Sequence, residues 1–240
     1  MDDKENYPSE QEARELLVQA GHVLYDQGYV VTNDGNISLK IAPDVIVVTP
    51  HGISKGSMNP DMMIVMDLDG TVLNQAEGWP PSSEVKMHLR AYRENPAINA
   101  VVHAHPIYAT AYAIAGIALD EPILCESALQ TGIVPVAHYA EPGTNEVPDS
   151  IAPYVNEYGA VLLSNHGVLT WGSNLDEAMS RMEVVENYAQ ISFVVRQLGS
   201  MRRLSKGQVR GLARIRRNMN MSPVVLPTGV EFATNTVDVL

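Results

Sequence analysis

The chain has 240 residues, of which 45% are hydrophobic and 18% charged, a composition typical of a soluble globular protein with a substantial core. The formal net charge of −12 argues against a general nucleic-acid-binding protein. No apolar run approaches the roughly 18 residues needed to cross a bilayer, and the acidic N-terminus lacks the basic and apolar parts of a secretory signal. The single cysteine, Cys125, cannot form an intrachain disulfide. We therefore expect a cytoplasmic protein with neither nucleic-acid nor membrane partners.

The predicted elements begin with a helix over Ser9 to Gln27, where apolar residues recur at helical spacing and Ser9 with Glu12 forms a capping box. Short apolar runs broken by turn residues then predict strands at 37–41, 45–49, 63–66 and 71–73. A helix through about Arg93 follows, with Ser82 or Ser83 as its N-cap. The remaining elements are a strand at 100–103, a helix at 106–115, a strand at 134–137, a helix at 151–158, strands at 160–163 and 168–171, a long helix to Leu198 capped by Asn174, and a short helix at 208–217.

No linker or internal repeat divides these elements, so the sequence predicts a single α/β domain over residues 1–218, built on a mainly antiparallel sheet. Residues 219–240 show no clear period and are interpreted as a C-terminal tail that docks on a neighbouring subunit. Between Met201 and Leu240, seven basic residues stand against two acidic ones, which leaves −17 on the first 200 residues. We interpret the basic segment as a helix face that docks on an acidic neighbouring subunit.

Two histidines separated by one residue, His103 and His105, end a predicted strand. Side chains two apart on a strand point to the same face, so their imidazoles can share one metal ion. For two histidines at this spacing and no further ligand, the alternative is that they are packing or surface residues. His166 follows another predicted strand, directly before Gly167, and offers a third nitrogen. Three neutral nitrogen ligands with one open position are typical of a catalytic zinc site.

Three predicted turns carry groups that can bind an anion. Ser82 and Ser83 stand at a helix start, where free backbone N–H groups and the helix dipole favour a phosphate. Asn33 and Asn36 flank an Asp-Gly turn that exposes successive backbone amides, and Gly52 lies in a similar turn at a strand end. Plain capping and hairpin roles are the alternatives at these positions.

Five motifs occur in one order along the chain: Gly-Asn-Ile-Ser, Thr-Pro-x-Gly, Ser-Ser-Glu, His-x-His-Pro and Asn-His-Gly. In this order and spacing the chain, from Ser9 to Leu198, resembles the class II aldolase/adducin-head family. The known enzymes of that family are L-fuculose-1-phosphate aldolase and L-ribulose-5-phosphate 4-epimerase. The resemblance implies a three-layer αβα sandwich around a mainly antiparallel central sheet. It also implies a homotetramer with active sites at subunit interfaces.

The same resemblance implies roles for individual residues. His103, His105 and His166 match the family's metal ligands, with Zn²⁺ expected and Mn²⁺, Co²⁺ or Fe²⁺ as alternatives. Glu84 matches the general base and acid, and glutamate in place of the epimerase's aspartate favours aldol cleavage. His88, four residues later on the same helix, is a weaker candidate for the metal. Five residues match positions that bind the substrate phosphate: Asn33, Asn36, Gly52, Ser82 and Ser83.

The implied activity is that of a metal-dependent aldolase, a lyase of carbohydrate metabolism. It would cleave a small phosphorylated ketose, such as a ketose 1-phosphate, into dihydroxyacetone phosphate and an aldehyde through a metal-stabilised enediolate. A sugar-phosphate 4-epimerase, a decarboxylase and a dehydratase are alternatives on the same scaffold. A non-catalytic module like the adducin head is disfavoured because all three histidines and the glutamate are present.

The chain departs from the family pattern at three places. His51 stands where the family more often has serine or threonine before Gly52. The related aldolase uses a tyrosine in its C-terminal segment, but no tyrosine follows Tyr188 here, and Glu126 lies near the place of a second such tyrosine. Residues 201–240 match nothing in the family pattern. We therefore expect a substrate other than L-fuculose 1-phosphate.

Overall fold

Eight strands form one sheet in the order β4-β3-β2-β1-β5-β8-β7-β6, in a computed structural model that describes residues 7–230. All neighbouring strands are antiparallel except β6 and β7, which are parallel. The predicted mainly antiparallel sheet is therefore confirmed. The strands are β1 (Asn36–Ala42), β2 (Val45–Val48), β3 (Ile64–Asp67), β4 (Val72–Asn74), β5 (Ala100–Ala104), β6 (Val136–Ala137), β7 (Ala160–Leu163) and β8 (Gly167–Gly172).

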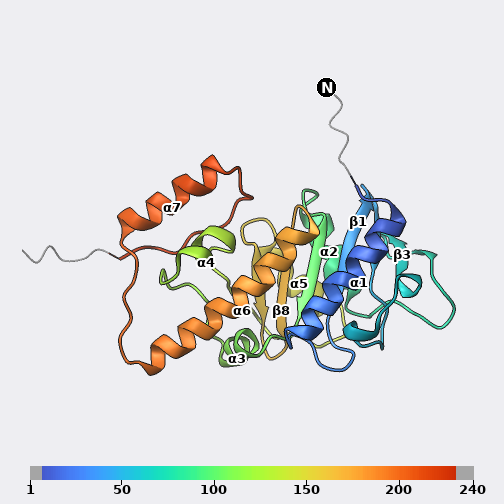
Figure 1. Cartoon of the computed structure of the whole chain (residues 1–240), viewed down its shortest axis with the longest axis horizontal. Helices are drawn as coiled ribbons and strands as arrows, with labels where there is room; N and C mark the ends of the chain where they lie inside the picture. Colours follow the sequence, from blue (N-terminus) through green and yellow to red (C-terminus); the bar gives the residue numbers. More distant parts are fainter. Residues whose placement is uncertain (1–6, 231–240) are drawn as a thin grey trace, which may run out of the picture.

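Helices cover both faces of the sheet and enclose a hydrophobic core on each side (Figure 1). Helices α1, α3 and α6 contribute to one core, and α2 and α5 to the other, so the predicted αβα sandwich is confirmed. Among residues 7–230, no helix has the length and apolar character that a membrane span requires. The helices are α1 (Glu10–Asp26), α2 (Val85–Glu94), α3 (Ile107–Ala115), α4 (Cys125–Gln130), α5 (Glu146–Ile151), α6 (Leu175–Gln197) and α7 (Lys206–Asn218), with 3-10 turns η1 (Lys55–Ser57), η2 (Pro60–Met62) and η3 (Ala152–Tyr154).

The ends of the long helices follow their capping residues. Ser9 precedes α1, and its Oγ accepts a hydrogen bond from the Glu12 amide at 3.2 Å. Asn174 precedes α6 and accepts from the Glu177 amide at 2.8 Å. Each side chain satisfies a backbone N–H that has no partner inside the helix. The predicted starts of these two helices are confirmed.

Two predicted boundaries are wrong. Glu84, not Ser82 or Ser83, occupies the N-cap position of α2. Ser82 Oγ instead accepts from the Glu84 amide at 3.3 Å in the turn before the helix, and the Glu84 side chain makes no capping hydrogen bond. The helix predicted at 151–158 begins earlier, as α5, and ends at Ile151. η3 follows from Ala152 and contains Pro153, whose ring has no N–H to continue an α-helix.

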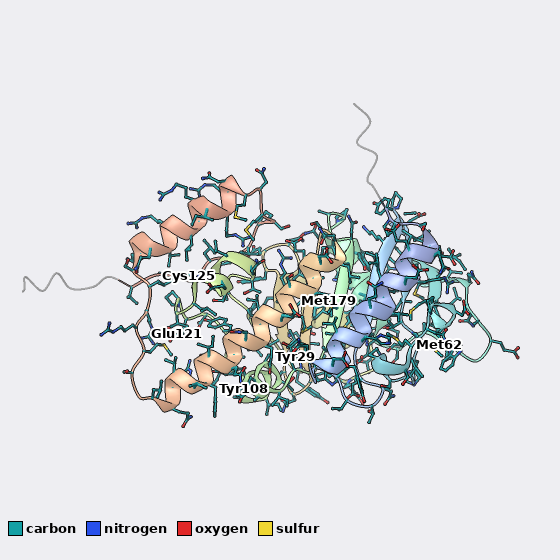
Figure 2. The ribbon with its side chains drawn as sticks, viewed as in Figure 1. Tyr29, Met62, Tyr108, Glu121, Cys125 and Met179 are labelled. Carbon is teal, nitrogen blue, oxygen red and sulfur yellow. The ribbon has the colours of Figure 1, made fainter. Side chains whose placement is uncertain are left out.

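The basic helix α7 lies beside α4, beyond the edge of the sheet (Figure 1). Glu121, labelled in Figure 2, anchors the segment that leads to it, because its carboxylate accepts a hydrogen bond from the Arg203 guanidinium at 2.8 Å. After α7 the chain returns, and Val225 exchanges backbone hydrogen bonds with Ile133 and Glu157 at 2.8 and 3.1 Å. The described part of the predicted tail thus pairs with its own chain. Residues 231–240 lie outside the described residues, and docking on a neighbouring subunit stays a prediction.

Candidate metal centre

Strand order brings the three predicted histidines together at one end of the interior strands β5, β7 and β8. β5 lies between β1 and β8 and is antiparallel to both, so His103 pairs with Asn36 on one side and with Leu169 on the other. His105 follows the end of β5, and His166 lies in the short loop between β7 and β8. One ring nitrogen from each histidine lies within 4.8 Å of the other two.

Two backbone features allow this close approach. Gly167 opens β8, and a Cβ atom there would lie 2.4 Å from Cδ2 of His105 and 2.6 Å from the Ala104 carbonyl oxygen. Only glycine fits between these groups. Asn165 has a φ of 57°, a left-handed conformation that asparagine tolerates better than most residues. This turn directs His166 back toward the other two rings.

The donor set fits a divalent metal ion. His103 is fully buried, and its Nδ1 donates to the Val168 carbonyl oxygen at 2.8 Å, which leaves the Nε2 lone pair facing the cluster. The Nε2 atoms of His103 and His105 lie 3.0 Å apart. Burial lowers the pKa of His103 well below its usual value and also lowers the pKa of His105. Both rings are therefore neutral, as metal ligands must be.

Glu84 faces the histidines from the start of α2. Its Oε1 lies 3.0 Å from Nε2 of His166, and its Oε2 lies 3.6 Å from Nε2 of His103. Oε2 also accepts a hydrogen bond from Nδ2 of Asn36 at 2.7 Å. Burial acts to raise the pKa of the Glu84 carboxyl, but hydrogen bonds from His166 and the Asn36 amide favour the carboxylate, and the net pKa lies below the ordinary value. Glu84 is therefore ionised at neutral pH.

A cavity of about 350 Å³ opens beside this cluster. It contains most of the residues that the sequence singled out: Asn33, Asn36, Ser82, Ser83, Glu84, His105 and His166. His103 is buried, and Gly52, with a φ of 80°, follows the cavity residue His51 without lining the cavity itself. The His51 amide donates to the Pro80 carbonyl at 2.8 Å, which joins the two turns that carry the predicted phosphate ligands.

Three further residues that line the cavity were not predicted from the sequence. Asp34 lies 3.6 Å from Nδ1 of His105, and Pro142 and Gly143 form part of the wall. The sequence indicated Asp34 only as the first residue of the Asp-Gly turn. The other two lie in a Pro/Gly-rich loop whose sequence carries no sign that it folds toward the histidines.

Lys55, which does not line the cavity, was also not predicted from the sequence. Its side chain is fully buried, and Nζ donates to the backbone carbonyls of Ile53 at 3.1 Å and Asn33 at 3.5 Å. It thereby connects two of the loops around the cavity. Burial lowers the pKa of this amine to about 8, although the charges of Asp34 and Glu84 act in the opposite direction.

Lys55 leads to a prediction about stability and pH. Below about pH 8 the lysine is charged in both the folded and the unfolded protein, and burial of the charged amine lowers the stability of the fold. Between about pH 8 and its ordinary value of 10.5, the folded protein has released a proton that the unfolded chain still binds, so stability rises with pH. Relative to Lys55→Met, the unfolding free energy of the unmodified protein should rise by on the order of 3 kcal/mol across this window. Urea denaturation at several pH values measures it, with the exposed Lys86→Met as control. A difference that does not change with pH would contradict the prediction.

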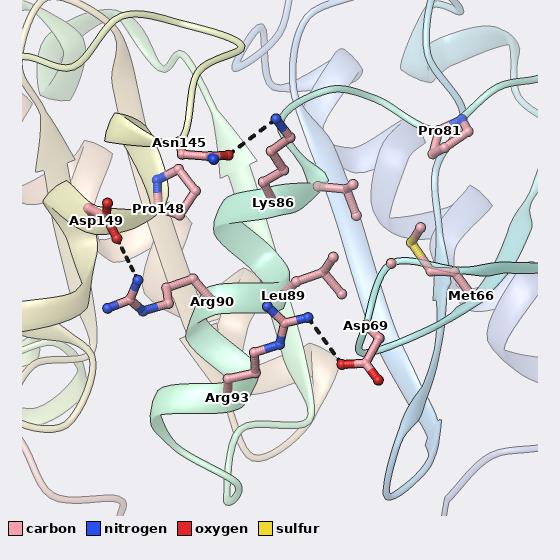
Figure 3. A pocket seen from close by; sticks show the side chains of 12 residues that line it. Met66, Asp69, Pro81, Lys86, Leu89, Arg90, Arg93, Asn145, Pro148 and Asp149 are labelled. Atoms are coloured by element: carbon pink, nitrogen blue, oxygen red, sulfur yellow. Dashed lines mark hydrogen bonds and ion pairs between the residues drawn. The ribbon is translucent and has the colours of Figure 1, made fainter.

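A larger cavity, of about 570 Å³, lies on the outer side of α2 (Figure 3). Three cationic side chains line it, but each already has a partner. Lys86 reaches Asn145 at 3.4 Å, Arg90 pairs with Asp149 at 2.6 Å, and Arg93 lies 3.5 Å from Asp69. None of the predicted site residues lines this cavity, so we assign the chemistry to the smaller one.

Comparison with known proteins agrees with this geometry. The sequence model of the class II aldolase and adducin N-terminal domain matches residues 15–193. An L-fuculose phosphate aldolase of Methanococcus maripaludis is 34% identical over 186 residues, which cover 76% of this chain and 97% of that protein. A 3-oxo-tetronate 4-phosphate decarboxylase of Haemophilus influenzae is 33% identical over 204 residues, which cover 83% of this chain and 95% of that protein.

Solved structures give the same result. The Klebsiella pneumoniae protein YgbL, described as a putative aldolase/epimerase/decarboxylase, superposes with a TM-score of 0.79 at 32% identity, covering 85% of this chain and 99% of that one. An L-fuculose 1-phosphate aldolase superposes with a TM-score of 0.79 at 30% identity, covering 88% and 100%.

Proposed function

The chain belongs to the class II aldolase/adducin family, and we propose that within it the protein is a metal-dependent aldolase. Its substrate would be a small phosphorylated ketose, cleaved to dihydroxyacetone phosphate and an aldehyde. The observation that carries the proposal is the position of Glu84. Its carboxylate lies 3.0 and 3.6 Å from two histidines of the cluster and lines the same cavity as the two serines and two asparagines of the predicted phosphate turns.

His103, His105 and His166 would hold the metal ion, for which we propose Zn²⁺, with Mn²⁺, Co²⁺ or Fe²⁺ as alternatives. A bound divalent ion supplies a Lewis acid that polarises a carbonyl and stabilises negative charge on oxygen. Glu84 would accept or return the proton at the reacting carbon or hydroxyl. A carboxylate at this distance from the cluster is well placed for either transfer.

The phosphate turns would position the substrate. Ser82 and Ser83 offer hydroxyls at the helix start, and Asn33 offers its side chain on a facing turn. Gly52, which does not line the cavity, would contribute through the turn that it shares with His51. Asn36 has only one amide hydrogen left for a phosphate, because its amide already bonds to Glu84 and to His88. Binding energy from the phosphate end would hold the reacting carbon in place beside Glu84.

A decarboxylase of a phosphorylated 3-oxo acid is the second candidate. The Haemophilus relative named for that activity matches 204 residues of this chain at 33% identity, a longer match than the 186 residues of the methanococcal aldolase. Both reactions leave negative charge beside a carbonyl, so the same three histidines and carboxylate would serve either one.

Product analysis on metal-loaded protein separates the two candidates. We expect dihydroxyacetone phosphate from at least one of a panel of ketose 1-phosphates, and near-stoichiometric metal that is lost in His103→Ala. The exposed histidine His22 gives a control variant, His22→Ala, which should keep both. Carbon dioxide from a phosphorylated 3-oxo acid, with no cleavage of the panel, would replace the aldolase by the decarboxylase. Protein that binds no metal after reconstitution would exclude both.

We also propose that the protein is a cytoplasmic homotetramer in which α7 contacts a neighbouring copy. Arg210, Arg214 and Arg217 are exposed along one face of α7, and no carboxylate among residues 7–230 forms an ion pair with them. The first 200 residues carry −17, so a second copy offers a complementary acidic surface.

Charge reversal tests this assembly. The triple variant Arg210→Glu, Arg214→Glu, Arg217→Glu should sediment as smaller species than the unmodified protein, because like charges then oppose at the contact. Reversal of Arg202, which lies before α7, should leave sedimentation unchanged. A triple variant that still sediments as the unmodified protein does would rule out α7 as the contact.

A further inference from the structure

A row of polar side chains runs through the otherwise apolar core between β1 and α2. Alternation along β1 sends Asn36 and Ser38 toward α2, whereas Ile37 and Leu39 enter the opposite core. On α2, residues four apart share a face, which aligns Glu84, His88 and Tyr92. Two residues of a strand span about 6.7 Å and four residues of a helix about 6 Å. The spacing of the polar residues along β1 therefore matches their spacing along α2.

His88 lies in the middle of this row and is fully buried. Its Nε2 lies 2.6 Å from Oδ1 of Asn36, and its Nδ1 lies 2.7 Å from Oγ of Ser38. The other end of the Asn36 amide, Nδ2, is the atom that contacts Glu84 at 2.7 Å. A single side chain therefore joins the buried histidine to the carboxylate of the site.

The direction of every hydrogen bond in the row follows from what each atom can do. Ionised Glu84 only accepts, so Asn36 presents Nδ2 to it and Oδ1 to His88. An amide oxygen only accepts, so the proton of His88 is on Nε2. Nδ1 then accepts from the Ser38 hydroxyl, and Ser38 Oγ accepts from Tyr92 OH at 2.7 Å. One arrangement satisfies every group.

The imidazole of His88 is neutral in this arrangement. Burial lowers its pKa to about 3, and the charge of Glu84 only partly opposes this. Both ring nitrogens are already hydrogen-bonded, and His88 is not part of the histidine cluster within residues 7–230. A role as a metal ligand, the weaker candidate from the sequence, is therefore excluded by geometry.

We propose that His88 is a positioning residue that acts through Asn36 to hold Glu84. The Asn36 amide fixes Oε2 of Glu84 and leaves Oε1 facing His166 and the cavity. Without His88, the oxygen of the Asn36 amide loses its hydrogen-bond donor. The orientation that directs Nδ2 toward the carboxylate is then no longer fixed from both ends. Glu84 then gains rotational freedom at the atom that transfers the proton. The importance of that atom rests on the proposed function, whereas the coupling from His88 to Glu84 does not.

Three variants separate positioning from packing. His88→Leu removes both hydrogen bonds at similar volume and should lower kcat by about 10²-fold, the scale of a small misplacement of a catalytic group, with KM and metal content little changed. His88→Gln keeps a donor for Asn36 and should recover most of that loss. Ser38→Ala keeps the link between His88 and Glu84 and should also retain most activity. If His88→Gln is as slow as His88→Leu, or if both lose metal and fold poorly, the positioning role is overturned.

A measurement on metal-free protein tests the coupling without any substrate. In protein labelled with ¹⁵N-histidine, the His88 signal, identified by its loss in His88→Gln, should show a proton on Nε2 and none on Nδ1. Glu84→Gln removes the charge at the far end of Asn36 and should move this Nε2–H resonance. Glu94→Gln, at the end of the same helix, should leave it in place. A proton on Nδ1, or an Nε2–H chemical shift that does not change in Glu84→Gln, would overturn the proposal even if the protein proves to be an aldolase. A protein that cleaves no substrate of the panel leaves this result intact.

Discussion

Replacing Glu84 with glutamine is expected to lower kcat by about 10²–10⁴-fold, the usual contribution of a positioned acid or base. Glutamine has nearly the same shape and can still accept from Asn36, but it cannot take up a proton. The three histidines do not change, so metal content measured by atomic spectroscopy should stay the same. The expected result is thus an enzyme that binds metal and substrate and turns over slowly.

The matched control for this variant is Glu94→Gln. Glu94 ends the same helix and pairs with Arg90 at 2.6 Å, outside the cavity of the histidines. The Glu94→Gln variant should keep full activity. Loss of metal in Glu84→Gln would show that the carboxylate is itself needed to retain the ion, and unchanged kcat would remove Glu84 from the chemistry.

The sheet and the long helices were predictable because each carries its own local signal. The apolar runs of β1, β2 and β5 are separated by turn residues, and α1 and α6 begin at side chains that cap them. The meeting of the three histidines was predictable for a different reason. They lie at or just after the ends of predicted strands, and the order of the family motifs along the chain assigns all three to one site.

The parts that were missed depend on contacts between distant segments. Lys55 lies in a short polar stretch, and nothing local shows that its amine is buried under the loops of Asn33 and Ile53. α4 has six residues, too few to establish a period. The sequence indicated His88 only as a metal ligand, although its spacing from Glu84 and Tyr92 on one helix face matches the alternation along β1. That match between two periods was the available signal.

The glycine beside His105 gives a prediction that sequence alone could not make. In Gly167→Ala the added methyl group would lie 2.4 Å from Cδ2 of His105 and 2.6 Å from a backbone oxygen. The backbone cannot yield easily because β8 pairs with β5 and β7 on either side, so the ring of His105 must move. We expect metal affinity to fall by about 10–100-fold, the range seen when groups that orient metal ligands are changed. Titration with a competing chelator measures this loss.

A second glycine on the same strand separates crowding from ligand displacement. A Cβ atom at Gly172 would lie 2.8 Å from Cβ of Glu177 and 2.9 Å from the Ala178 amide nitrogen, at the opposite end of β8 from the histidines. Both substitutions should therefore destabilise the fold by about 1–3 kcal/mol, as overpacking does. Only Gly167→Ala should also weaken metal binding, because only there is the crowded neighbour one of the three proposed metal ligands. Equal affinities in the two variants would mean that His105 can move without cost to the site, and would leave His103 and His166 as the residues on which retention of the metal depends.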